Sequence, residues 1–276
     1  MDKYYLREVK SLFNSAGYQA SDAEDLFMDL LRISYSNLHT GDWQLEVEQM
    51  SKLKEMINRR MKGEPVAHIV GYKEFLDWKF KVTDDTLIPR PETEVLVNEI
   101  VNKIIKGGAK RILEIGTGTG CVIISIVKEL LSKGISVSGV AIDISEAALE
   151  VARYNGKKLG VSGVIDFIKC DVRDFDRYDF DVVVSNPPYI PSNDLLSLES
   201  SVKDFEPHIA LDGGADGLYF YREIARYIAK LDKCILGVEF GIGQSNEILK
   251  IFHDLIEKRV IKDLGSIERV IICEKI

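Results

Sequence analysis

The chain of 276 residues carries 36 basic and 44 acidic side chains, giving a net charge of −8, and 46% of its residues are hydrophobic. These values are typical of a globular protein with a full apolar core, large enough for a catalytic domain and a smaller one. The negative charge provides no general attraction to phosphate backbones, which disfavours a nucleic-acid substrate while leaving room for a local basic groove.

No segment of the sequence resembles an export signal or a membrane anchor. The N-terminal run MDKYYLREVKSLF is interrupted by charges, and no apolar run approaches the roughly 20 residues that span a bilayer. We therefore expect a cytoplasmic protein that does not bind membranes. The four cysteines and four histidines are far apart, so the sequence predicts reduced, buried thiols and neither a metal site nor a Ser-His-Asp hydrolase.

Residues 1–62 are predicted to form a small helical bundle that binds the substrate protein. Ser21 and Glu24 have the spacing of a capping box, and apolar residues follow them at helical intervals. A further helix fits Leu45 to Met61, whose apolar residues also fall on one side.

The next segment, residues 63–90, is predicted to be a β-hairpin linker. Gly63-Glu64-Pro65 interrupts the helical pattern. Two short β-rich runs follow, VAHIV and EFLDWKFKV, separated by Gly71-Tyr72-Lys73, as expected for the two strands of a hairpin.

Residues 91–276 are predicted to form the catalytic domain, in which strands and helices alternate. The expected strands are RILEIG, VSGVAID, VIDFIKC, FDVVVSN, CILGVEF, RVIKDL and RVIICEKI. The expected helices are Glu92 to Lys106, Cys121 to Ser132, Ser145 to Lys158, Leu218 to Leu231 and Gln244 to Ile256. Apolar strands between helices indicate a mostly parallel α/β sheet covered on both faces, and the short last connection indicates one antiparallel pair. This Rossmann-like, seven-stranded arrangement resembles that of class I methyltransferases.

A glycine-rich segment lies where the first of these strands should pass into a helix. It consists of Gly116, Thr117, Gly118, Thr119 and Gly120. The dinucleotide fingerprint fails because Cys121 occupies the position of its third glycine, and no Gly-Lys-Ser/Thr follows to make a P-loop. The GxGxG spacing instead resembles motif I of S-adenosylmethionine enzymes, although a purely structural turn would also use glycines.

Acidic residues end the next two predicted strands. Asp143 can accept hydrogen bonds from both ribose hydroxyls of a cofactor, or it can cap the helix that begins near Ser145. Asp171 and Val172 follow the third strand, where they would border the adenine. Motifs of this kind at the ends of three successive predicted strands predict that the cofactor is S-adenosylmethionine, which leaves as S-adenosylhomocysteine.

The segment Asn186-Pro187-Pro188-Tyr189 begins where the carboxyl edge of the sheet should lie, which is where open α/β sheets bind ligands. The Asn186 side-chain oxygen and the Pro187 carbonyl can accept hydrogen bonds from a target NH₂ group and orient its nitrogen toward a methyl donor. Asn186 would also border the cofactor, Pro188 would stiffen the turn, and Tyr189 would pack on the planar target. A glutamine amide and the exocyclic amine of adenine fit equally well.

Together with these motifs, several further segments resemble the peptide chain release factor glutamine N5-methyltransferase (HemK/PrmC) family over nearly the whole chain. They are Gly63-Glu64-Pro65, LIPRPETE at Leu87 to Glu94, Phe205-Glu206-Pro207, Leu211 to Leu218, and Glu239-Phe240-Gly241 with Gln244. Phe240 and His68 stand where the family usually has Ile and Tyr, differences that packing can tolerate.

The resemblance implies an enzyme that methylates the glutamine of the Gly-Gly-Gln loop in class 1 release factors, acts as a monomer and does not bind nucleic acid directly. Arg90 and Glu92 would line the mouth of the active site, or form an inter-domain ion pair and a charge at a helix N-terminus. Glu206 and the glycine-rich stretch Leu211 to Gly217 would form a lid or a simple turn. The alternatives are an N6-adenine methyltransferase acting on DNA or RNA, and a non-catalytic protein that binds S-adenosylmethionine.

Overall fold

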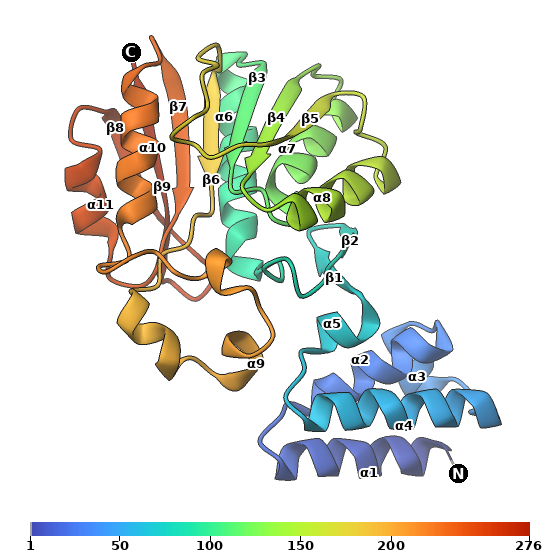
Figure 1. Cartoon of the computed structure of the whole chain (residues 1–276). Coiled ribbons are helices and arrows are strands. Elements are labelled where there is room, and N and C mark those ends of the chain that lie inside the picture. The colour runs from blue at the N-terminus through green and yellow to red at the C-terminus, as the bar shows by residue number, and fades with distance from the viewer. Residues whose placement is uncertain (1) are drawn as a thin grey trace. The chain divides into compact units, whose positions relative to one another are not determined.

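The computed structural model describes residues 2–276 and divides the chain into two compact units (Figure 1). The smaller unit contains the residues up to Tyr72 together with Glu199–Phe205, and the larger unit contains Lys73–Leu198 and Glu206–Ile276. No helix described over residues 2–276 is both long and apolar enough to cross a bilayer.

The smaller unit is helical. Its elements are α1 (Asp2–Ser15), α2 (Ala20–Leu31), α3 (Tyr35–Thr40), α4 (Val47–Met61), α5 (Val66–Val70) and α9 (Ser200–Lys203). Helix α2 packs against both α1 and α4, and its side chains Leu26 and Phe27 are fully buried. Each of the longer helices is amphipathic, and burying their apolar faces against one another forms a core separate from that of the larger unit.

The predicted capping box at Ser21 and Glu24 is wrong. Helix α2 begins at Ala20, so Ser21 already lies in its first turn and donates a 3.3 Å hydrogen bond to Gln19. A capping box forms instead at the start of α4, where the Glu46 side chain accepts from the backbone of Gln49 and the Gln49 side chain accepts from that of Glu46.

The hairpin lies one run later than predicted. VAHIV forms helix α5 because Pro65 precedes it and Gly71 follows it in the left-handed conformation, which are start and stop signals of a helix. The two strands are β1 (Tyr72–Phe75) and β2 (Trp78–Lys81), and the turn between them places Leu76 at a φ of 50°. Phe75 and Phe80 point from this hairpin into the core of the larger unit.

The larger unit confirms the predicted seven-stranded, mostly parallel sheet, with strand order β5-β4-β3-β6-β7-β9-β8 (Figure 1). Its strands are β3 (Arg111–Ile115), β4 (Ser138–Asp143), β5 (Ile165–Lys169), β6 (Val182–Ser185), β7 (Cys234–Glu239), β8 (Ile256–Lys262) and β9 (Glu268–Lys275). Its helices are η1 (Pro91–Thr93), α6 (Glu94–Gly107), α7 (Cys121–Ser132), α8 (Glu146–Lys158), η2 (Ser192–Ser197), η3 (His208–Ala210), α10 (Tyr219–Ala229) and α11 (Ser245–Ile251). Strand β9 runs antiparallel to its neighbours β7 and β8, and the other described strand pairs of this sheet are parallel.

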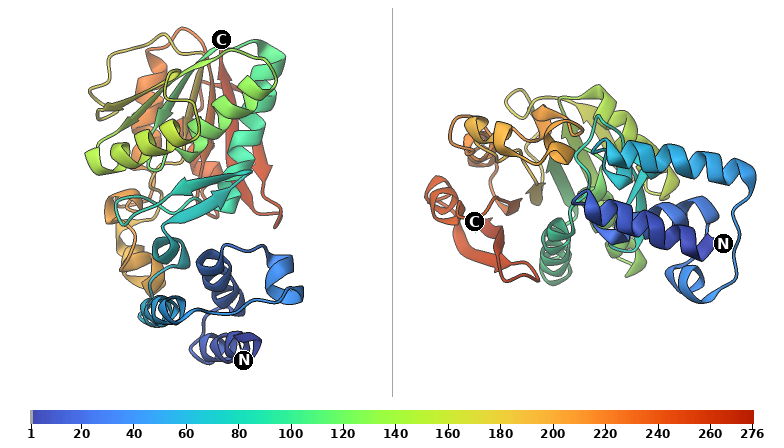
Figure 2. Two further views of the ribbon diagram at one scale, coloured as in Figure 1. Left: turned by 90° about the vertical axis from the view of Figure 1, so that its right-hand side faces the viewer. Right: turned by 90° about the horizontal axis from the view of Figure 1, so that it is seen from below.

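Helices cover both faces of this sheet (Figure 2). Helices α6 and α7 pack with the β1–β2 hairpin on one face, and α10 and α11 pack on the other. Strand order reverses between β3 and β6, because the chain crosses from β3 outward to β4 and β5 and then returns to β6. Such a switch point opens a crevice at the carboxyl ends of the strands, which is where ligands bind in this class of fold.

The last helix is shorter than predicted. Helix α11 ends at Ile251, five residues before the expected end at Ile256, because Phe252 and Leu255 turn into the core and Ile256 begins β8. Pairing with β9, which runs along nearly the whole length of β8, outweighs the helical pattern of the sequence.

Candidate active site

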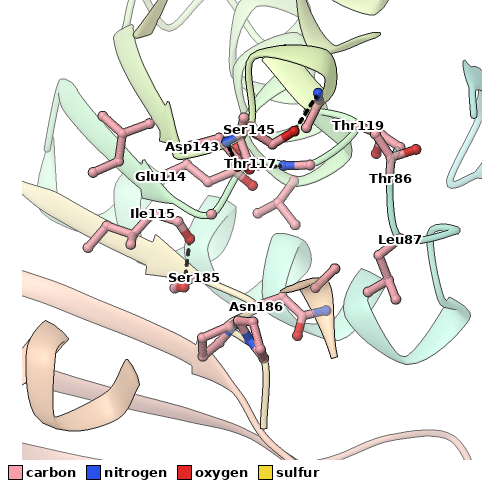
Figure 3. Close-up of a pocket in the computed structure, with 18 of the residues that line it drawn as sticks. Thr86, Leu87, Glu114, Ile115, Thr117, Thr119, Asp143, Ser145, Ser185 and Asn186 are labelled. Carbon is pink, nitrogen blue, oxygen red and sulfur yellow. Dashed lines mark hydrogen bonds between the residues drawn. The ribbon is translucent and has the colours of Figure 1, made fainter. Parts of the chain in front are cut away.

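A pocket lies at the carboxyl ends of β3, β4 and β6 in the larger unit (Figure 3). It encloses about 1080 Å³ of empty space, the part open to solvent included. Its walls come from four places that are far apart in the sequence: the segment Asp85–Arg90 with Thr93, the glycine-rich loop, the ends of β4 and β5, and Ser185–Pro188. Ile209, Ala210 and Phe220 complete the rim.

The glycine-rich loop presents backbone rather than side chains to the pocket. Gly116 and Gly118 have φ values of 74° and 52°, and a Cβ atom added to either would meet nothing within 4 Å. Gly120 differs, since it does not line the pocket and its Cβ would come within 2.8 Å of Ile124 at the start of α7. Gly116 to Thr119 therefore offer a surface that a ligand can approach closely, whereas Gly120 serves helix packing.

Asp143 connects the glycine-rich loop to the loop after β4. One carboxylate oxygen accepts a 2.9 Å hydrogen bond from the backbone N–H of Gly118, and the other accepts one of 2.9 Å from Ser145. Burial raises the pKa of Asp143, and the backbone donors oppose that change. Ser145 caps α8, by accepting from the N–H of Ala148, so Asp143 is not the helix cap that the sequence left open as an alternative.

Asp171 and Val172 line the same pocket from the loop after β5. The Asp171 carboxylate is bound by Arg173 through a 2.5 Å contact, and this hydrogen bond lowers the pKa of Asp171. Val172 is buried and supplies an apolar wall. The pair thus offers an apolar wall beside an ionised group, at the place where the sequence predicts the adenine.

A buried carboxyl, Glu114, lies beneath the glycine-rich loop. It is 2% exposed and accepts a hydrogen bond from the hydroxyl of Thr117. Burial raises the pKa of Glu114 to about 8, and the nearby charge of Asp143 acts in the same direction. A largely protonated Glu114 can therefore sit close to Asp143 without strong repulsion.

Asn186 follows β6 and faces the glycine-rich loop across the pocket (Figure 3). Its side-chain nitrogen donates a 3.2 Å hydrogen bond to the hydroxyl of Thr93. Its side-chain oxygen is buried and has no hydrogen-bond partner among the described residues. A buried acceptor without a donor costs free energy unless a ligand supplies one, which makes this oxygen a marker of a binding site.

The rest of the Asn-Pro-Pro-Tyr segment divides between the pocket and the interior. Pro187 and Pro188 line the pocket, and the preceding Ser185 anchors the strand by donating a 2.7 Å hydrogen bond to the carbonyl of Ile115 (Figure 3). Tyr189 is not among the lining residues. Its ring packs over Gly241 and against the apolar core, and burial raises its pKa to about 12. Contact between Tyr189 and a planar target stays a prediction.

The linker segment before η1 is tied down by a buried ion pair. Arg90 contacts Glu206 at 2.5 Å, and Glu206 also accepts a 3.0 Å hydrogen bond from the N–H of Ile88. Arg90 lines the pocket as well, whereas its ion pair lies within the larger unit and is not the inter-domain pair considered from the sequence. Glu92 lies in the first turn of η1 and outside the pocket lining.

Sequence motifs did not reveal the residues that support the site from behind. Thr93, which lines the pocket, is one, and Glu239 at the end of β7 is another: the side chains of Thr93 and Asn186 lie near its buried carboxyl and lower its pKa. Thr93 lay inside the LIPRPETE segment and Glu239 inside the Glu-Phe-Gly segment, but no rule of spacing connects either residue to Asn186. Only the fold brings them together.

The described residues 2–276 contain no cluster of three or more His, Cys, Asp or Glu side chains that could hold a metal ion. The cysteines are free thiols: Cys121, Cys234 and Cys273 are buried, and Cys170 is half-buried at the pocket wall.

Comparison with known proteins gives concordant matches over both units. Residues 106–255 match the sequence family described as Methyltransferase domain, and residues 5–71 match the one described as PrmC N-terminal domain. The release factor glutamine methyltransferase of Thermodesulfovibrio yellowstonii is 33% identical over 98% of this chain and 98% of its own length. The protein of the same name from Caulobacter vibrioides is 37% identical over 83% of this chain and 80% of its own.

Among solved structures, the catalytic domain of hMettl16 in complex with MAT2A 3'UTR hairpin 6 is similar with a TM-score of 0.54. The match covers 83% of this chain and 86% of that one at 13% sequence identity. At this identity the likeness concerns the fold alone.

Proposed function

This chain belongs to the release factor glutamine methyltransferase family, and we propose that it methylates the side-chain nitrogen N5 of the glutamine in the Gly-Gly-Gln motif of class 1 release factors. It is an S-adenosylmethionine-dependent methyltransferase. The observation that supports an NH₂ target is the buried Asn186 oxygen, which has no donor among the described residues although Asn186 lines the pocket; the family match favours a glutamine amide over adenine.

The residues around the pocket fit S-adenosylmethionine. Asp143 at the end of β4 can accept hydrogen bonds from ribose hydroxyls, and the open backbone of Gly116 and Gly118 leaves room for close approach. Asp171 and Val172 would border the adenine. When bound, the cofactor supplies an electrophilic methyl group on a positively charged sulfur.

The chain's own contribution is to orient a weak nucleophile. A glutamine side-chain nitrogen has its lone pair delocalised into the carbonyl, so its reaction depends on alignment with the methyl donor. The Asn186 oxygen and the Pro187 carbonyl would each accept one N–H of the target, which fixes the nitrogen and stabilises the positive charge that develops on it. The extra proton is acidic once the nitrogen is alkylated and leaves to solvent, so no strong base is required.

The two units would divide the work. The site is built entirely from the larger unit, within the range 91–276 expected for the catalytic domain apart from the linker residues Asp85–Arg90. The helical unit would bind the body of the release factor, which its match to the PrmC N-terminal domain supports. Because one chain supplies the whole pocket, we infer that it acts as a monomer. We also infer that it acts in the cytoplasm, where release factors work. Its net charge of −8 provides no general attraction to phosphate backbones, so we expect no direct contacts to nucleic acid.

The test is mass spectrometry of a purified class 1 release factor after incubation with the enzyme and S-adenosylmethionine. We expect one added methyl group on the Gly-Gly-Gln glutamine, and its loss with Asn186→Ala. Asn102→Ala, on the exposed side of α6, is the matched control and should methylate normally. Failure of the wild-type enzyme to modify the release factor, with S-adenosylmethionine bound, would overturn the assignment and direct attention to adenine in nucleic acids.

A further inference from the structure

The Asn186 side chain can serve as an acceptor only in one of its two orientations. The amide presents an oxygen on one side and an NH₂ group of similar size on the other, and a half-turn about its last bond exchanges them. If the NH₂ group of Asn186 pointed toward the pocket, it would face the NH₂ group of a target glutamine, and two donors cannot form a hydrogen bond. Something in the fold must therefore select the orientation with oxygen toward the target.

Two residues behind Asn186 supply that selection. The hydroxyl of Thr93 accepts from the Asn186 nitrogen at 3.2 Å. The side chains of Thr93 and Asn186 also lie close enough to the Glu239 carboxyl to lower its pKa as donors, although its Oε2 atom has no hydrogen-bond partner among the described residues. Thr93 and Glu239 are each 2% exposed, so water has little access to replace either acceptor.

The position of Thr93 leaves its hydroxyl available for this contact. Thr93 lies where η1 passes into α6 and has a helical backbone conformation, from which its side chain does not cap the helix. The hydroxyl instead lies between Asn186 and Glu239, and can donate to the carboxyl while accepting from the amide.

We propose that Thr93 and Glu239 are positioning residues for the methyl transfer, which hold the Asn186 amide with its nitrogen inward and its oxygen toward the substrate. The inference rests on the proposed function, since that function gives the Asn186 oxygen its role as an acceptor. Glu239 lies outside the pocket lining, and Thr93, although it lines the pocket, is assigned its role through its hydrogen bond with Asn186. Their effect is transmitted through the orientation of Asn186.

The chemistry of Glu239 suits this role over a wide range of conditions. Burial raises the pKa of Glu239 to about 7, the charge of Glu92 adds to this effect, and Arg269 opposes it. The phenols of Tyr189 and Tyr221 also lie near the carboxyl. Whether protonated or ionised, a carboxyl retains an acceptor oxygen for the Asn186 nitrogen. When ionised, it adds negative charge behind an amide whose oxygen faces a developing positive charge.

The experiment compares Thr93→Val, which keeps the shape of the side chain and removes the hydroxyl, with Thr93→Ser, which keeps the hydroxyl. We measure kcat for release factor methylation, the Kd for S-adenosylmethionine and the thermal midpoint of each variant. Thr93→Val should lower kcat about tenfold with the Kd for the cofactor unchanged, because misplaced reacting groups cost rate rather than cofactor affinity. Thr93→Ser should recover kcat to within about threefold of the wild type.

A second pair tests Glu239 and the route of the effect. Glu239→Leu should lower kcat about as much as Thr93→Val does, and Glu239→Gln, which keeps an acceptor oxygen, should lose less. Because Thr93 acts through Asn186, adding Thr93→Val to Asn186→Ala should not lower further the residual rate of Asn186→Ala, measured as single turnover at high enzyme concentration.

The outcomes separate the two proposals. An inactive wild-type enzyme would contradict the proposed function, and the positioning roles would fall with it. An active wild type with a Thr93→Val variant of equal kcat would overturn the positioning roles alone. Those roles would also be overturned if Thr93→Val lowers kcat only in proportion to lost cofactor binding or lost folded protein, because that pattern indicates a merely structural contact.

Discussion

Removing Arg90 should destabilise the larger unit more than neutralising its partner Glu206, although both changes break the same ion pair. The asymmetry follows from burial: the Glu206 side chain is 1% exposed, whereas that of Arg90 is 32% exposed. In Arg90→Ala, a carboxylate stays buried with only the N–H of Ile88, at 3.0 Å, as a donor. In Glu206→Gln, the Arg90 guanidinium can turn toward water, and the new side chain still offers an oxygen to Ile88.

The magnitudes follow from the cost of each unpaired group. Breaking a buried ion pair by removing one partner costs up to about 3–5 kcal/mol, and the remaining hydrogen bond and water from the pocket reduce this to about 2–4 kcal/mol for Arg90→Ala. Glu206→Gln weakens the hydrogen bonds of this side chain but leaves each buried group a partner, so it should lower the free energy of unfolding by about 1 kcal/mol. For a domain of this size, each kcal/mol lowers the melting temperature by about 2–4 °C.

The assay is thermal unfolding followed by circular dichroism in the absence of cofactor. The relevant transition is the one that S-adenosylmethionine raises in the wild type, because a ligand stabilises the unit that binds it. We expect the Arg90→Ala midpoint to fall by at least twice as much as that of Glu206→Gln. Equal shifts, or a larger shift for Glu206→Gln, would refute the reasoning that the buried carboxylate sets the cost.

Three further predictions concern the site. Gly217→Ala should lower stability and kcat more than Gly243→Ala does. Both glycines have left-handed φ values, of 72° and 82°, but a methyl group at Gly217 would collide with the Tyr189 carbonyl, whereas one at Gly243 would meet nothing within 4 Å. Comparable losses in unfolding and kinetic assays would contradict this. Burial raises the pKa of Glu239 to about 7, so the folded protein keeps a proton that the unfolded chain releases near pH 4.5. Stability should therefore fall between about pH 4.5 and 7, and Glu239→Gln should flatten that slope in denaturant titrations; an unchanged slope would count against a raised pKa. Asp143→Ala should weaken S-adenosylmethionine binding about 10- to 100-fold in calorimetry, and unaltered affinity would remove Asp143 from the site.

The sequence was informative wherever function constrains a short stretch of chain. The strand–loop–helix pattern around Gly116 and the run ending at Asn186 placed both at the carboxyl edge of the sheet, and the structure brings them to one pocket. One local pattern gave a wrong prediction. VAHIV has the composition of a strand, but it lies between a proline and a left-handed glycine, and these flanking residues favour helix α5. Five residues hold too little periodicity to outweigh their boundaries.

What the sequence could not supply is the side-chain environment behind the site. The sequence predicts Tyr189 as a substrate contact because it adjoins Pro188, and it could not show that the ring lies over Gly241 and packs against the apolar core. Its backbone carbonyl is held there by a 2.9 Å hydrogen bond from Gln244, which lies 55 positions further along the chain. Such contacts depend on the register of β6 against β7, and no one-dimensional pattern encodes them.

The groups that face the expected substrate are neutral, and this has a chemical reason. An acceptor placed beside an electrophilic methyl group must orient the target without being alkylated itself. A carboxylate in the position of Asn186 would orient an NH₂ group well, but it would also be a competing nucleophile with two exposed oxygens. An amide oxygen accepts hydrogen bonds almost as well and is a far weaker nucleophile. The fold accordingly keeps the ionisable group, Glu239, one layer behind, where it is 2% exposed and can polarise and orient the amide without reaching the methyl donor.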